Sequence, residues 1–284
     1  MKVTVLNKLF IKRLSISELL LSFCFIALLL GSCSGKNRNA KTYLAEAETA
    51  LNKGNYSLAK LKIDSIKEVF PTSFDEITEG FELMQKVRMA ENQRNIVYCD
   101  SMLRVNYEQL REMLESFNYA RDPQYQEFGD YVPKTYPLNT SFSQNGLRSA
   151  VNERGQMYIE SVLSGTSLKH NKIKVSTRDG SFAESLPVTT DGLNYRFSTL
   201  GGTYEIVRFA GNDDNGVAKF IYTFKDEPLT LTFTGNRNHA IPLPQAAKKA
   251  IAQSFELSTL LLDIESLKYE KGRSEALIKY LQSR

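Results

Sequence analysis

The chain has 284 residues, with 36 Lys and Arg against 32 Asp and Glu, a formal net charge of +4, two His, three Cys and no Trp. Four basic residues but one acidic residue lie within residues 1–32, so the rest of the chain keeps 32 basic and 31 acidic residues and a net charge near +1. This balance excludes a basic nucleic-acid-binding domain. Two His also leave a zinc site short of its usual ligands unless carboxylates replace them.

The first 32 residues have the composition of a secretory signal. Basic side chains precede an apolar run at residues 19–30, and the small residues Gly31 and Ser32 follow it. The run is shorter than the ~20 residues that a helix needs to cross the hydrocarbon core of a membrane. A basic region, a short apolar region and small residues together predict a cleavable signal peptide at residues 1–32.

The end of this segment, Leu30-Gly31-Ser32-Cys33, resembles the lipobox of bacterial lipoproteins. The resemblance implies cleavage between Ser32 and Cys33, a diacylglyceryl thioether on Cys33, and acylation (palmitate or a similar chain) of the new amino terminus. Two or three acyl chains anchor a protein stably to a membrane. The alternative is an ordinary signal peptide or an N-terminal membrane anchor with an incidental cysteine. Ser34 is not the aspartate that retains many lipoproteins at the inner membrane, so we expect a periplasm-facing protein, with the outer membrane favoured.

Residues 33–39 are polar and predict a short tether, and residues 40–118 predict helices. Residues 40–73 resemble one tetratricopeptide unit, whose pattern is carried by small and apolar residues, a turn glycine and a closing proline: Tyr43, Ala47, Ala50, Gly54, Ala59, Ile63, Ile66 and Pro71. The pattern does not repeat, so it implies a helical hairpin rather than a peptide-binding solenoid, and an ordinary helical hairpin is the alternative. Apolar residues at helical spacing over residues 74–117 predict a long helix or coiled-coil stalk.

Residues 119–155 have no clear period and contain several prolines, so we expect a connecting segment. Four tyrosines of this segment, Tyr119, Tyr125, Tyr131 and Tyr136, are candidate ligand contacts in a glycan or peptide groove. Packing against the helices is the alternative for the same side chains.

Residues 156–243 predict an antiparallel β domain, a sandwich or open barrel. Strands are expected at residues 158–162, 172–177, 193–198, 203–209, 217–224 and 229–234. Residues 211–216 are expected to form a hairpin turn, in which Asp213 and Asp214 have no EF-hand spacing. His170 and His239 are expected to be solvated residues of turns.

Residues 244–284 predict one helix at residues 244–270, a break at Gly272 and a short helix at residues 274–281. The fold class is therefore α+β. Because both long helices need a partner for their apolar stripes, we expect the C-terminal helix to pack antiparallel on the long helix before the β domain. Two separate domains lying side by side are the alternative.

No nucleophile elbow, zinc-protease motif, phosphate-binding loop or dinucleotide fingerprint occurs in the sequence. Cys99 is expected to be a small buried helix residue. We therefore expect no catalytic residues, metal or cofactor, and a non-enzymatic protein that contacts membrane lipid through Cys33. The leading hypothesis is binding to another envelope protein or self-association, as a scaffold. The alternatives are a glycan- or peptidoglycan-binding β domain and a carboxylate-based hydrolase.

Overall fold

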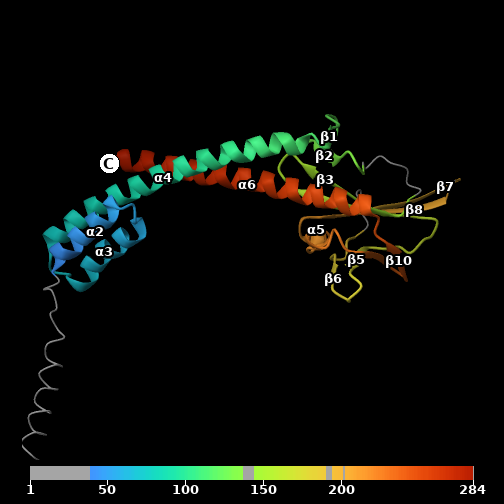
Figure 1. Ribbon diagram of the computed structural model, residues 1–284, viewed down its shortest axis with the longest axis horizontal. Coiled ribbons are helices and arrows are strands. Elements are labelled where there is room, and N and C mark those ends of the chain that lie inside the picture. The colour runs from blue at the N-terminus through green and yellow to red at the C-terminus, as the bar shows by residue number, and fades with distance from the viewer. Residues whose placement is uncertain (1–38, 137–143, 190–193, 201, 284) are drawn as a thin grey trace, which may run out of the picture. The chain divides into compact units, whose positions relative to one another are not determined.

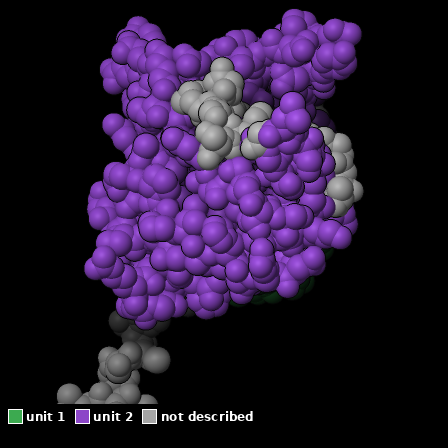
Figure 2. All heavy atoms as spheres, turned by 90° about the vertical axis from the view of Figure 1, so that its right-hand side faces the viewer, with its two compact units in different colours: residues 1–91 green, residues 92–284 purple. Residues whose placement is uncertain are grey.

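The computed structural model describes residues 39–136, 144–189, 194–200 and 202–283 (Figure 1). The expected signal peptide, the Ser32–Cys33 junction and most of the tether lie outside the described residues. The chain divides into two compact units, residues 1–91 and 92–284, and helix α4 runs from the first into the second. Figure 2 colours the two units and shows the second from the end that carries the strands.

Unit 1 (residues 1–91) contains helices α2 (Ala40–Asn52) and α3 (Tyr56–Val69) and the first part of α4 (Phe74–Leu114). The side chains of Asn39 and Asn55 cap α2 and α3 by accepting hydrogen bonds from the backbone of Thr42 and Leu58. Small and aliphatic side chains from all three helices form the core of this unit: Leu44, Ala47, Ala59, Ile63, Ile66, Leu83, Met84 and Val87. The expected helical hairpin is confirmed, whereas its membership of the tetratricopeptide class stays a prediction.

Unit 2 (residues 92–284) contains two antiparallel sheets. The six-stranded sheet has the order β1 (Phe117–Ala120), β2 (Asp130–Pro133), β3 (Gly146–Asn152), β4 (Met157–Ser164), β8 (Gly202–Ala210) and β7 (Tyr195–Thr199). The four-stranded sheet has the order β10 (Asn238–Pro242), β9 (Thr230–Thr234), β5 (Lys172–Ser176) and β6 (Phe182–Glu184). A 3-10 turn η1 (Gly211–Asp214) and the helices α5 (Val217–Thr223) and α6 (Gln245–Gln282) complete the unit.

The main core lies between the two sheets. Val207 and Phe209 of β8 belong to one cluster with Ile173 of β5 and with Leu231 and Phe233 of β9. Alternate residues of β5 and β9 point into this cluster, as expected for strands with one buried face. Residues of α5 and the first turns of α6 also belong to it. The α+β class and the antiparallel, sandwich-like arrangement of strands are therefore confirmed.

Helix α6 packs antiparallel on the part of α4 that belongs to unit 2, as expected. Lys271 Nζ lies 2.6 Å from Asp100 Oδ1, and the Asn95 side-chain amide donates to Ser274 Oγ at 2.8 Å. Farther along the pair, Leu257 and Leu261 of α6 form an apolar cluster against which Leu110, Met113 and Leu114 of α4 pack. Cys99 is buried on α4, which confirms its predicted role.

Several local expectations differ from the structure. The segment expected to connect the helices to the β domain contains β1, β2 and β3, half of the larger sheet. Residues 217–223, part of a segment expected to form a strand, form α5. Val217, Ala218 and Ile221 of this helix are buried at helical spacing, and Asp214 accepts a hydrogen bond from Ala218 N in its first turn. Residues 211–214 form a 3-10 turn rather than a hairpin loop.

Helix α6 does not break at Gly272. A glycine inside a helix lowers the stability of the helix by only about 1 kcal/mol relative to alanine. The contacts that Lys271 and Ser274 make with α4 on either side of this position hold the helix together. His239, expected in a turn, lies on β10.

Candidate ligand-binding pocket

A pocket of about 750 Å³ lies at one end of the six-stranded sheet in unit 2. Strand register explains why distant residues meet there. Asp130 of β2 pairs with Asn152 at the end of β3, and Tyr158 of β4 pairs with Ala210 at the end of β8. Four elements therefore line the pocket at this end of the sheet: the β3–β4 turn, the end of β8, the loop before β2 and one face of α6. The volume of the pocket is in the range of small-ligand sites, about 300–1,000 Å³.

The pocket combines an apolar lining with polar groups. The apolar side chains are Phe128, Met157, Ile159, Ala218, Phe255 and Leu262. The polar ones are Gln126, Glu127, Asp130, Asn152, Gln156, Tyr158, Arg208, Asp214 and Ser258. A mainly apolar concavity with a few converging polar groups is the usual composition of a binding site.

Gly155 fixes the β3–β4 turn against α6. Its φ of +80° is in the left-handed region, and a Cβ at this position would lie 2.9 Å from Leu261 Cβ. Its carbonyl accepts a hydrogen bond of 2.6 Å from Ser258 Oγ. Only glycine meets both demands without strain. The turn that forms one wall of the pocket is therefore held close to the helix that forms another.

Tyr158 and its neighbours organise the polar wall. The Tyr158 hydroxyl donates to Asp130 Oδ2 at 3.2 Å, and the guanidinium carbon of Arg208 lies 3.9 Å from the centre of the Tyr158 ring. Burial raises the pKa of Tyr158, with the carboxylates of Asp130 and Glu160 adding to the effect. The phenol therefore stays protonated and remains a hydrogen-bond donor at neutral pH.

A row of charged residues crosses the sheet behind this wall. Arg148 of β3, Glu160 of β4 and Arg208 of β8 are direct cross-strand neighbours. Arg208 Nη2 donates to Glu160 Oε2 at 3.2 Å. Glu160 and Arg148 are buried, so the carboxylate between two guanidiniums compensates charges that would otherwise be expensive to remove from water. Arg208 Nε is buried and has no hydrogen-bond partner among the described residues.

Asp214 contributes a second aspartate to the pocket. Burial raises the pKa of its carboxyl, and the hydrogen bonds from Ala218 N and Gly216 N act in the opposite direction. Asp214 ends η1, and its side chain accepts a hydrogen bond from Ala218 N in the first turn of α5, which fixes its orientation. Asp130 and Asp214 thus line one pocket from β2 and from η1.

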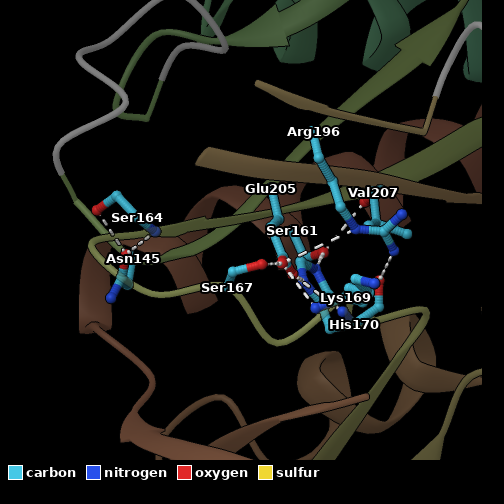
Figure 3. Close-up of polar contacts among 9 residues, drawn as sticks. All are labelled: Asn145, Ser161, Ser164, Ser167, Lys169, His170, Arg196, Glu205 and Val207. Atoms are coloured by element: carbon cyan, nitrogen blue, oxygen red, sulfur yellow. Dashed lines mark hydrogen bonds and ion pairs between the residues drawn. The ribbon is translucent and has the colours of Figure 1, made fainter. Parts of the chain in front are cut away.

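A second polar cluster lies inside unit 2, between the sheets (Figure 3). Ser161 Oγ lies 2.8 Å from His170 Nε2, and His170 Nδ1 lies 2.6 Å from Glu205 Oε2. The order serine, histidine, carboxylate is that of a hydrolase triad. All three residues, however, are 0% exposed, so a substrate cannot reach the serine oxygen in this structure.

The contacts around this cluster indicate a structural role. Glu205 also accepts hydrogen bonds from the backbone N–H groups of Lys169 and His170, at 2.7 and 2.9 Å. Arg196 Nε lies 3.8 Å from Glu205 Oε1, and Arg196 Nη2 donates to the His170 carbonyl at 3.0 Å. The carboxylate therefore holds the loop between β4 and β5. The prediction that His170 is a solvated turn residue was wrong, because its loop folds under β8 and Glu205 supplies its ring with a partner.

Both members of the His170–Glu205 pair have shifted pKa values. Burial lowers the pKa of His170, and Glu205 opposes that effect. Burial acts to raise the pKa of Glu205, but the hydrogen bonds from His170 and Lys169 outweigh it and leave the pKa below its usual value. The neutral imidazole and the ionised carboxylate are therefore the favoured forms at neutral pH.

The four tyrosines singled out in the sequence do not line the pocket among the residues assigned to it. Tyr119 and Tyr131 face each other across β1 and β2, with ring centres 5.5 Å apart, and the Tyr119 hydroxyl donates to Glu153. Tyr125 is 78% exposed. Tyr136 packs at the margin of the main core.

The pocket residues Gln126, Glu127, Phe128 and Asp130 nevertheless come from the same segment, 119–155. Tyr158 and Arg208 were missed, because no local motif marks residues that only strand register brings together. Asp214 was named only as a residue of the expected hairpin turn, and it lies in η1. Within the described part of the chain, no group of His, Cys, Asp and Glu side chains could hold a metal ion.

No described helix is both long and apolar enough to cross a membrane. Comparisons with protein-family models, with curated proteins and with solved structures found no match to this chain.

Proposed function

We propose that the chain is a lipid-anchored, non-enzymatic binding component of the bacterial cell envelope, and that the pocket of unit 2 holds its target. The pocket is the observation that carries this proposal, because it joins an apolar lining to polar groups held in place by strand register. The Leu30-Gly31-Ser32-Cys33 sequence supports the anchor, and the proposal places the protein facing the periplasm, with the outer membrane favoured.

The anchor is tested by labelling cells with an alkyne analogue of palmitate. The wild-type chain is expected to incorporate the label and to sediment with membranes, whereas Cys33→Ser is expected to lose both properties. Cys99→Ser is the matched control, because Cys99 is the other cysteine beyond the expected cleavage position and is buried in α4. Label retained by Cys33→Ser would contradict the proposed anchor.

The target of the pocket, in this proposal, is another component of the envelope, and self-association through the helices is the related form of a scaffold role. Affinity capture after crosslinking in intact cells, together with sedimentation of the purified chain, tests both. A strictly monomeric chain that captures no envelope component would contradict the binding role.

A second candidate function is hydrolysis of a glycosidic bond. It is favoured by one observation, that two aspartates, Asp130 and Asp214, line the same pocket and that burial raises the pKa of Asp214. Release of nitrophenol from a panel of 4-nitrophenyl glycosides, abolished by Asp214→Asn, is the expected result for an enzyme. Equal rates with and without the protein would contradict it.

A further inference from the structure

The polar groups that line the pocket of unit 2 include both hydrogen-bond donors and hydrogen-bond acceptors. Asp130 supplies carboxylate oxygens that accept, Arg208 supplies N–H groups that donate, and the amides of Gln126 and Gln156 can do either. A ligand that pairs with all of these groups must itself donate and accept hydrogen bonds at closely spaced positions. Hydroxyl groups can do both, because each carries one O–H donor and two acceptor lone pairs.

Most charged groups of the pocket already have partners. Arg208 is paired with Glu160 at 3.2 Å, and Glu127 lies 3.9 Å from Arg154. Asp130 accepts a hydrogen bond from the Tyr158 hydroxyl, and Asp214 accepts one from the backbone N–H of Ala218. A strongly charged ligand would therefore have to replace existing contacts and would lose its own hydration. These contacts favour a neutral ligand.

Apolar surface in the same pocket supplies the other part of the recognition. Phe128 and Phe255 line it together with Ile159 and Leu262. The Phe128 ring is half-buried, and the Arg154 guanidinium covers it at 4.0 Å from the ring centre. Rings and aliphatic groups can bury the C–H surfaces of a ligand whose edges carry the hydroxyls.

We propose that the pocket of unit 2 binds a neutral saccharide, with its hydroxyls on Asp130, Gln126 and Arg208 and its C–H surfaces against the apolar lining. The Arg208 side chain is 27% exposed, so part of its guanidinium can meet such a ligand from the pocket. This inference rests on the proposed function, because it names the class of ligand that the same pocket takes.

Isothermal titration calorimetry tests the inference with the full chain in a detergent that has no sugar headgroup. The probes are three neutral disaccharides (chitobiose, cellobiose and maltose), the cation trilysine and the anion N-acetylmuramic acid. At least one neutral disaccharide is expected to bind, and Asp130→Ala is expected to weaken that binding about 10-fold, the equivalent of one hydrogen bond of ~1.4 kcal/mol. Glu153→Ala, on the adjacent β3–β4 turn but outside the pocket lining, is expected to leave the affinity unchanged.

Gln126→Ala is a second variant, in a loop residue that is not part of the core, should Asp130→Ala fail to fold. It is also expected to weaken disaccharide binding. Binding of trilysine alone would overturn the saccharide assignment, and binding of N-acetylmuramic acid alone would overturn the assignment of a neutral ligand. Either result would leave the binding function standing. Disaccharide binding that neither pocket variant weakens would overturn the assignment to this pocket. No heat with any probe would overturn the inference, and the crosslinking assays in cells would then decide on the binding function separately.

Discussion

Replacement of Glu205 tests the structural role assigned to the buried serine–histidine–carboxylate cluster. In Glu205→Ala, four donors lose their acceptor. The backbone N–H groups of Lys169 and His170 and the His170 ring nitrogen Nδ1 lie 2.6–2.9 Å from the carboxylate, and the Ser167 hydroxyl lies 3.4 Å from it. Arg196 loses the carboxylate that lies 3.8 Å from its Nε. Because Glu205 and His170 are 0% exposed, water does not replace these contacts without rearrangement.

The expected loss is large. Each buried donor left unpaired costs about 1–3 kcal/mol. Removal of one member of a buried ion pair, here Glu205 from its pair with Arg196, typically costs about 3–5 kcal/mol in total. We therefore expect Glu205→Ala to lower the free energy of unfolding by about 3–5 kcal/mol. For a unit of this size each kcal/mol lowers Tm by roughly 2–4 °C, so Tm is expected to fall by about 6–20 °C.

Thermal and urea unfolding followed by circular dichroism measure this loss. Glu265→Ala is the matched control, because Glu265 is an exposed partner of Lys268 and such pairs contribute at most about 1 kcal/mol. A loss below about 1 kcal/mol for Glu205→Ala, or equal losses for the two variants, would refute the view that Glu205 holds the β4–β5 loop.

Three further predictions concern two glycines and the pH dependence of stability. Gly155→Ala is expected to destabilise the chain by about 1–3 kcal/mol, because the new Cβ would lie 2.9 Å from Leu261 Cβ and the backbone there is left-handed. Urea unfolding measures this loss, and an unchanged urea midpoint would contradict the close packing of the turn on α6. Gly272→Ala is expected to stabilise by about 0.5–1 kcal/mol, because a Cβ there meets nothing within 4 Å and the residue is inside α6; a lowered Tm would argue against a continuous helix. The free energy of unfolding is expected to fall as the pH drops below about 6.5, because the pKa of His170 is lower in the folded than in the unfolded chain. It is expected to fall again below about 4.3, because the pKa of Glu205 is also lower in the folded chain. His170→Gln should flatten the pH dependence of the unfolding free energy between pH 7 and 5, and an unchanged dependence there would contradict the buried neutral imidazole.

Periodic patterns in the sequence predicted the long helices and five of the later strands, β4, β5, β7, β8 and β9, but not β6, β10 or α5. The alternation of Leu229, Leu231 and Phe233 with threonines indicated β9, and the apolar stripe after Pro244 indicated α6. Residues 217–224 have a composition that suits both states, and the hydrogen bond from Ala218 N to Asp214 is one contact that favours the helix. Such a contact depends on side-chain placement, which composition alone does not give.

The pocket was harder to predict from the sequence than the fold. Asp130, Tyr158 and Arg208 are far apart along the chain, and they meet only because β2, β3, β4 and β8 are neighbours in one sheet. His170 presented the same difficulty, since a histidine after Ser167 and Lys169 suggests a solvated turn. Its partner Glu205 lies 35 residues away along the chain, and tertiary contacts of that range overrode the local pattern.

The central claim, that the pocket of unit 2 binds an envelope component, is tested most directly by site-specific photocrosslinking in intact cells. A photoreactive phenylalanine analogue at Phe128, which lines the pocket, is expected to form a discrete adduct after illumination. The same analogue at Tyr269, which is 70% exposed on α6 and outside the pocket lining, is expected to form none of that species. No adduct at Phe128, or the same adducts at both positions, would contradict the claim.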